Sequence, residues 1–142
     1  MTRIEKSEKV SAGAEILFKL LNDYEGYSRW NPMILKSEKN GKGYIFKTSV
    51  GEQLVKKNER VPFLKVSHSY ENNPHIMETG ETFRTCTQCK DTNVTFYAIS
   101  SNGKITDEMH KETELKLKGL KHYAEYLENG GNPDSYSKLQ MI

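Results

Sequence analysis

The stretch from Thr106 to Asn129 constrains the fold most, because its pattern predicts one long amphipathic helix. Thr106 can cap the first turn, and Asp107 and Glu108 place negative charge at the positive end of the helix dipole. One face then repeats at spacings of three and four residues, through Thr113, Leu117, Leu120, Ala124 and Leu127. Two glycines from Gly130 can end the helix. At about 1.5 Å per residue such a helix spans roughly 36 Å, so its apolar face needs a broad partner.

Composition limits the classes of protein that fit. The 142 residues suit a single domain over 1–142, with 131–142 as an irregular tail after the helix. Basic and acidic residues number 21 and 19, a near balance that gives no reason to expect nucleic acid as a partner. Mean hydropathy is -0.76, and no apolar run approaches the roughly 20 residues of a membrane span. We therefore expect no stable membrane insertion, and a cytoplasmic location because the N-terminus lacks the apolar core of a signal peptide.

The N-terminal part predicts one strand and two short helical segments. Charged residues alternate with apolar ones from Thr2 to Val10, which indicates an edge strand. Ser11 is the expected N-cap of a short amphipathic helix, whose face is Ala14, Leu17, Phe18 and Leu21. The segment YEGYSRWNP then suits a second short helix or turn, in which Trp30 anchors the segment to the core.

The middle of the chain reads as short strands separated by turns. The pattern Asn40-Gly41 predicts a hairpin, and further turn signals divide the segment up to Asn102-Gly103. We count about six consecutive antiparallel strands between the short helices and the long helix. The predicted fold class is therefore α+β, with an antiparallel sheet of about seven strands including the first.

Three segments resemble a known superfamily. They are SAGAEILFKLLNDYEGYSRWNP near the start, TQCKDTNVTFYA in the last hairpin and LKGLKHYAEYLENG in the long helix. In this order they resemble the START-like or SRPBCC superfamily, which includes polyketide cyclases, lipid-transfer domains and plant pollen-allergen proteins. The resemblance implies the helix-grip fold, in which a curved sheet surrounds the C-terminal helix and leaves a cavity. From Lys36 to Thr79 only the strand pattern agrees, so no subfamily is indicated.

Strand parity and the helix face together predict the cavity wall. Residues of one parity on three strands should face inward, and the helix adds its apolar face. The expected ligand-binding residues are Tyr44, Phe46, Val66, His68, Tyr70, Phe83, Thr85, Met109, Thr113 and Leu117. Such a wall would suit a small hydrophobic molecule, such as a lipid, a polyketide-like molecule or an aromatic compound, with a polar end near His68 or Tyr70. The alternative is that the same residues only fill a core.

Few residues point to specific chemistry. His68 and Tyr70 are the weak candidates for catalysis, because each can exchange a proton. Cys86 and Cys89 have the spacing of zinc and redox sites, but no further ligand pair accompanies them, so we expect no metal and no cofactor. The lysines of KLKGLKHY suit a solvated helix face. Gly119, inside the helix, indicates either a bend or close contact with the sheet.

Three functions remain open at this stage. The first is binding of a small hydrophobic ligand in the cavity between the sheet and the C-terminal helix. The second is a cyclase or dehydratase type of enzyme that uses the same cavity. The third is a protein-interaction module like the co-chaperones of this superfamily. Fold alone does not choose among them, and the sequence does not indicate the oligomeric state.

Overall fold

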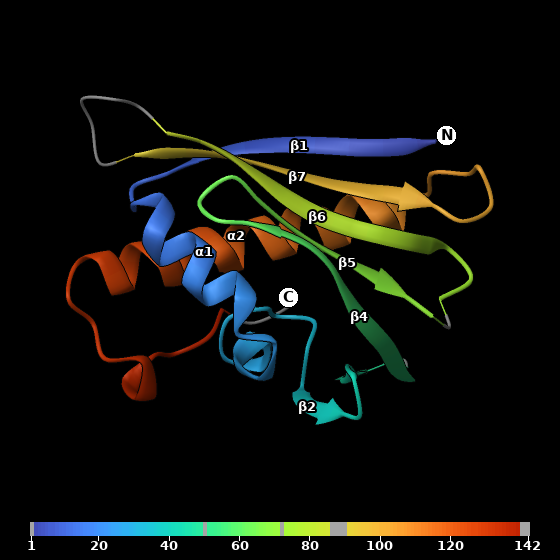
Figure 1. Ribbon diagram of the computed structural model, residues 1–142, viewed down its shortest axis with the longest axis horizontal. Helices are drawn as coiled ribbons and strands as arrows, with labels where there is room; N and C mark the ends of the chain where they lie inside the picture. The colour runs from blue at the N-terminus through green and yellow to red at the C-terminus, as the bar shows by residue number, and fades with distance from the viewer. Residues whose placement is uncertain (1, 50, 72, 86–90, 140–142) are drawn as a thin grey trace.

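A computed structural model describes residues 2–49, 51–71, 73–85 and 91–139. Its strands and helices follow the predicted order, with seven strands, two α-helices and short 3₁₀ segments (Figure 1). The first part of the chain contains β1 (Arg3–Val10), α1 (Ala14–Asn22) and η1 (Tyr24–Arg29). The meander contains β2 (Lys36–Asn40), β3 (Gly43–Thr48), β4 (Gly51–Val61), β5 (Lys65–Tyr70), β6 (Ile76–Thr85) and β7 (Thr92–Ser100). The chain then forms α2 (Asp107–Glu128) and η2 (Pro133–Ser135).

All seven strands form one antiparallel sheet in the order β1-β7-β6-β5-β4-β3-β2. Strands β2 to β7 pair with their neighbours in sequence, as a meander of short connections requires. Strand β1 departs from this rule, because it pairs with β7 from Arg3↔Ile99 to Val10↔Thr92. The curved antiparallel sheet with a long C-terminal helix confirms the predicted α+β helix-grip architecture, and β1 is an edge strand as expected.

Helix α2 runs along one face of the sheet (Figure 1). Its cap is the predicted one, since the Thr106 side chain accepts a hydrogen bond from the backbone N–H of Met109 at 3.1 Å. The helix ends at Glu128 with Asn129 as its C-cap, so its predicted bounds are confirmed. Its buried face is Met109, Thr113, Lys116, Leu117, Gly119, Leu120, Tyr123 and Ala124.

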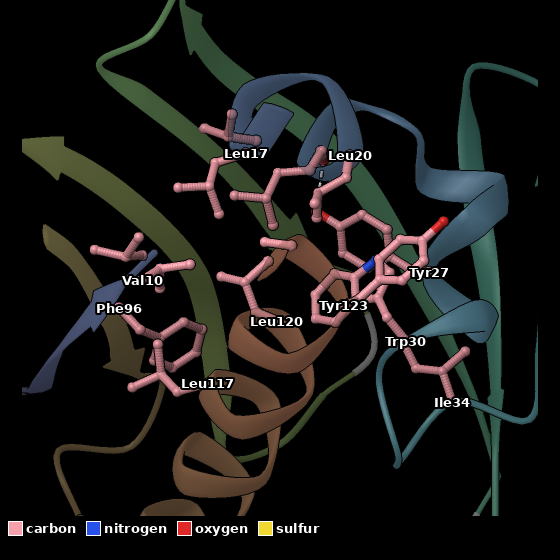
Figure 2. Packing of buried hydrophobic residues seen from close by; sticks show 14 of the residues in the cluster. Val10, Leu17, Leu20, Tyr27, Trp30, Ile34, Phe96, Leu117, Leu120 and Tyr123 are labelled. Atoms are coloured by element: carbon pink, nitrogen blue, oxygen red, sulfur yellow. Dashed lines mark hydrogen bonds between the residues drawn. The ribbon is translucent and has the colours of Figure 1, made fainter. Parts of the chain in front are cut away.

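The C-terminal half of α2 packs into an apolar core. In Figure 2, Leu117 and Leu120 of α2 lie among side chains from α1, the sheet and the segment after η1. Trp30 is only 1% exposed in this core, which confirms the predicted anchor. Gly119 is buried against the same segment, where an added β-carbon would lie 2.5 Å from the carbonyl oxygen of Trp30. The close contact inferred from Gly119 is therefore with this segment and not with the sheet.

The turn before α1 differs from the prediction. Gly13, not Ser11, is the N-cap of α1, and it makes no side-chain cap. The physical reason is that acidic side chains of α2 bind this turn. Glu125 Oε2 accepts from the backbone N–H of Ser11 at 2.8 Å, and Glu128 Oε1 accepts from that of Gly13 at 2.8 Å. The C-terminal turns of α2 therefore fix the start of α1.

Candidate functional site

Two adjoining cavities lie where the first half of α2 passes the turn after β3 and the loop before β6. The smaller has a volume of about 210 Å³ and the larger about 490 Å³. Both are lined by Thr48, Gln53, Asn73, Ile76, Glu108 and Glu112. Sheet and helix therefore leave a space at this end of the molecule, whereas Leu120 and Ala124 in the other half of α2 are fully buried in the core.

The smaller cavity has a mixed wall, in which apolar side chains stand among more numerous polar and charged ones. Buried Phe46 and Ile34 contribute to the apolar part, with half-buried Leu115 from α2. Tyr70 and Glu112 are among the polar residues of the same wall. Partial burial raises the pKa of the Glu112 carboxyl above its usual value, and the negative charge of Glu108 adds to this. Glu112 therefore keeps its proton to a higher pH than an exposed glutamate and can then donate a hydrogen bond.

Tyr70 connects the cavity wall to a buried histidine. Its hydroxyl lies 3.2 Å from Nε2 of His68, which is also 2.8 Å from the hydroxyl of Thr79. On the other side of the ring, Nδ1 lies 3.0 Å from the hydroxyl of Tyr24. Burial lowers the pKa of His68 well below its usual value, and the positive charge of Lys116 lowers it further. His68 is therefore neutral at neutral pH and holds the hydroxyl groups around it in place.

Lys116 corrects the expectation that the lysines of KLKGLKHY lie on a solvated face. Lys118 is exposed, but the side chain of Lys116 is only 6% exposed and its Nζ lies 2.7 Å from Oε1 of Glu81. The Glu81 side chain on β6 is fully buried. The physical reason is helical spacing, since Lys116 follows buried Thr113 by three residues and precedes buried Leu120 by four.

The predicted site residues divide into four groups. Phe46, Tyr70 and Met109 line the cavities. Five others are buried without lining them, and these are Val66, His68, Phe83, Thr113 and Leu117. Tyr44 is half-buried and stacks on Tyr24 with 5.2 Å between ring centroids. Thr85 is exposed because it is the last residue of β6, so its expected inward position is wrong.

Sequence reasoning missed most of the cavity wall on α2. It placed Met109, Thr113 and Leu117 there, but of these only Met109 lines a cavity, and the stripe of Glu108, Glu112 and Leu115 was missed. This stripe also has helical spacing and lies beside the apolar one. Among so many charged residues, nothing distinguished the half-buried Glu112 or the exposed Glu108 as part of a cavity wall. Asn73, in the loop before β6, and Ile76, the first residue of β6, were missed because strand parity gives no information on loops and little at the end of a strand.

The described part of the chain gives no support for metal chemistry. Within it, no group of three or more His, Cys, Asp or Glu side chains could hold a metal ion. Cys86 and Cys89 lie outside the described residues. No helix in the described ranges is long and apolar enough to cross a membrane.

Comparison with solved structures gives the fold class. A START superfamily protein from Mycobacterium smegmatis matches with a TM-score of 0.67 and 15% identity, over 89% of this chain and 97% of the other. The protein XoxI from Bacillus cereus matches with a TM-score of 0.74 and 16% identity, over 90% of this chain and 99% of XoxI. The di-domain ARO/CYC protein BexL from the BE-7585A biosynthetic pathway matches with a TM-score of 0.74 and 14% identity. The match covers 91% of this chain and 48% of BexL. This chain therefore has the START-like (SRPBCC) fold, and its structural neighbours include di-domain ARO/CYC proteins.

The sequence comparisons add no closer relationship. No protein-family model matches the sequence, and a comparison with curated proteins finds no relative.

Proposed function

We propose that this protein binds a small, mainly apolar ligand in the two adjoining cavities between the sheet and the first half of α2. One observation carries the proposal: the two cavities lie between the sheet and α2, and although polar and charged residues are numerous among their lining residues, the surface that they expose is more apolar than polar. The larger cavity alone, at about 490 Å³, is within the usual range for such sites. The structural neighbours in the START superfamily agree with this function.

The wall indicates the chemistry of the ligand. Ile34, Phe46 and Leu115 offer a surface for an apolar ring or chain. Burial raises the pKa of the Tyr70 phenol, so its hydroxyl keeps its proton and can donate a hydrogen bond to a ligand oxygen. The carboxyl of Glu112 is the second polar group near the same space.

A cyclase or dehydratase type of enzyme is the second candidate, and one contact favours it. The Tyr70 hydroxyl lines the cavity and is 3.2 Å from Nε2 of His68, so the two candidate groups for proton transfer are in contact. His68 itself reaches the cavity only through Tyr70. Binding therefore comes first in the proposal, and turnover would be an addition to it.

A dye-binding experiment tests the proposed site. An apolar dye with environment-sensitive fluorescence should bind with about micromolar affinity, near -8 kcal/mol. Leu115→Trp should weaken this binding, because the larger side chain fills the smaller of the two adjoining cavities, and its half-buried position spares the core. Fluorescence titration of the purified protein measures the dissociation constant.

A matched control uses another cavity. Leu127 is a half-buried leucine of the same helix and lines a separate cavity of about 500 Å³ beside α1. Leu127→Trp should leave dye binding unchanged. Absence of dye binding, or loss of binding only in Leu127→Trp, would contradict the proposal. Absence of binding would instead favour a packed, co-chaperone-like interaction module.

A further inference from the structure

Asn31 places a buried amide group in the wall of the smaller cavity. It lies in the segment after η1, between Trp30 and Pro32, and it is only 3% exposed. Among the buried polar residues of the described chain, Asn31 alone lines either of the two cavities. The other polar residues of these walls are half-buried or exposed, so water reaches them more easily.

Hydrogen bonds hold the Asn31 amide in one orientation. The backbone N–H of Asn31 donates to the carbonyl oxygen of Tyr27 at 2.9 Å, and its own carbonyl accepts from the N–H of Ile34 at 3.1 Å. Oδ1 of the side chain accepts from the backbone N–H of Met33 at 3.0 Å. Because an N–H group donates to the oxygen of an amide and not to its nitrogen, this contact also fixes the position of Nδ2.

The side-chain nitrogen Nδ2 of Asn31 makes no hydrogen bond to the described residues. Fully enclosed side-chain atoms without a hydrogen bond lie on Asn22, Trp30 and Glu81 within the described ranges, and Nδ2 of Asn31 is not among them. Its N–H groups therefore open on the cavity that Asn31 lines. A nearly buried donor without a partner costs free energy, and an acceptor on a ligand would remove that cost.

The other polar groups of the wall indicate the kind of acceptor. Tyr70 lines the same cavity of about 210 Å³, and its hydroxyl is a second uncharged donor. A carbonyl oxygen has two lone pairs and can accept from both. Glu108 and Glu112 outnumber Lys111, the one cation among the described lining residues, so a ligand carboxylate would be repelled.

We propose that Asn31 orients the ligand by donating a hydrogen bond to an uncharged carbonyl oxygen, as in a ketone, an ester or an amide. This inference rests on the proposed function and specifies the class of ligand. The apolar part of the ligand lies against Phe46 and Ile34, which are buried in the same wall. Since the donor is already held in place, binding does not have to order it.

Two probes of the same shape test the selection. 2-Acetylnaphthalene and 2-isopropenylnaphthalene differ only in that a C=O group of the first is a C=CH₂ group in the second. Displacement of the environment-sensitive dye, followed by fluorescence, measures their affinities for the wild-type protein. We expect the ketone to bind at least tenfold more tightly, which corresponds to about 1.4 kcal/mol. 2-Naphthoic acid, which is ionised at neutral pH, should bind more weakly than the ketone.

Asn31→Asp tests the donor itself. Aspartate keeps an oxygen for the Met33 amide but has a second oxygen in place of Nδ2. We expect the preference for the ketone to disappear, while the affinity for 2-isopropenylnaphthalene stays close to wild type. The matched control is Asn132→Asp, which adds the same charge. Asn132 is exposed, lines neither cavity, and its Oδ1 accepts from the backbone N–H of Asp134 at 2.9 Å. The control should keep the preference for the ketone.

The outcomes separate this inference from the proposed function. If the dye does not bind, the proposed function fails, and the role of Asn31 fails with it. If the dye binds but the ketone displaces it no better than the hydrocarbon does, the cavity stands and the role of Asn31 is wrong. A preference that survives in Asn31→Asp, or that disappears in Asn132→Asp as well, also overturns the inference.

A second variant covers the case in which Asn31→Asp does not fold. Asn31→Ser keeps a hydroxyl oxygen for the Met33 amide, but its side chain is too short to replace Nδ2. We expect the preference for the ketone to be lost there too, and an unchanged preference would overturn the inference.

Discussion

Gly119 is the residue at which α2 comes closest to the segment after η1. A β-carbon there would lie 2.5 Å from the carbonyl oxygen of Trp30 and 2.8 Å from Cδ of Pro32. Gly119→Ala should therefore destabilise the protein by about 1–3 kcal/mol, because overpacking outweighs the helix propensity gained. Urea unfolding measures this change in the free energy of unfolding.

A neighbouring position provides the control for Gly119. Lys118 is exposed on the same helix, so Lys118→Ala should change stability by less than about 0.5 kcal/mol. A Gly119→Ala protein that is more stable than wild type would show that the segment after η1 can move away from α2.

His68 should make the stability of the protein depend on pH. Its pKa is lowered in the folded state, so below pH ~6.5 the unfolded chain binds a proton that the folded protein does not. Stability should therefore fall as pH decreases, by up to about 1.4 kcal/mol per pH unit. Urea unfolding at pH 7 and pH 5 should show a larger loss for wild type than for His68→Gln, which lacks the titrating ring. Equal losses in the two proteins would contradict a neutral buried imidazole.

At the scale of elements, α2 has two halves with different surroundings. Its C-terminal half carries Leu120 and Ala124, which are fully buried in the core. Its N-terminal half carries Glu108, Glu112 and Leu115, which line the cavities. The cavities therefore depend on how firmly the first turn of α2 is held.

The cap at Thr106 provides a direct test of that first turn. Thr106→Ala removes the hydrogen bond to the Met109 amide and should cost about 1 kcal/mol of stability. Thr106→Ser keeps the hydroxyl and should stay close to wild type in urea unfolding. If the alanine and serine variants have equal stability, the cap contributes nothing.

Sequence alone predicted elements better than it predicted the site. The bounds of α2 followed from a capping threonine, an apolar stripe and the two glycines from Gly130, all of which act within one element. Parity likewise predicted that Val66, His68 and Phe83 face inward, and all three are buried. Strand parity predicts the face of the sheet on which a side chain lies, but it does not predict whether a cavity lies next to that side chain. Whether a residue lines a cavity depends on the distance between two elements, which no local pattern records.

At the scale of the whole molecule, the predicted order of strands was enough to give the sheet. Short turns between β2 and β7 leave few alternatives to a meander, and the resemblance of three segments gave the helix-grip fold. The buried pair of Glu81 and Lys116 could not be predicted from the sequence, because its two residues are 35 positions apart and each looks like an ordinary surface charge.

The pairing of β1 with β7 has a consequence for synthesis on the ribosome. Strand β1 emerges first, but its partner residues, Thr92 to Ile99, emerge roughly 90 residues later. At about 5–20 residues per second the first strand waits for about 5–20 s. The meander can form during that time, whereas α2 follows later still. Completion of the sheet and its burial by α2 are therefore late events. Incomplete chains expose the face of the sheet that α2 later buries.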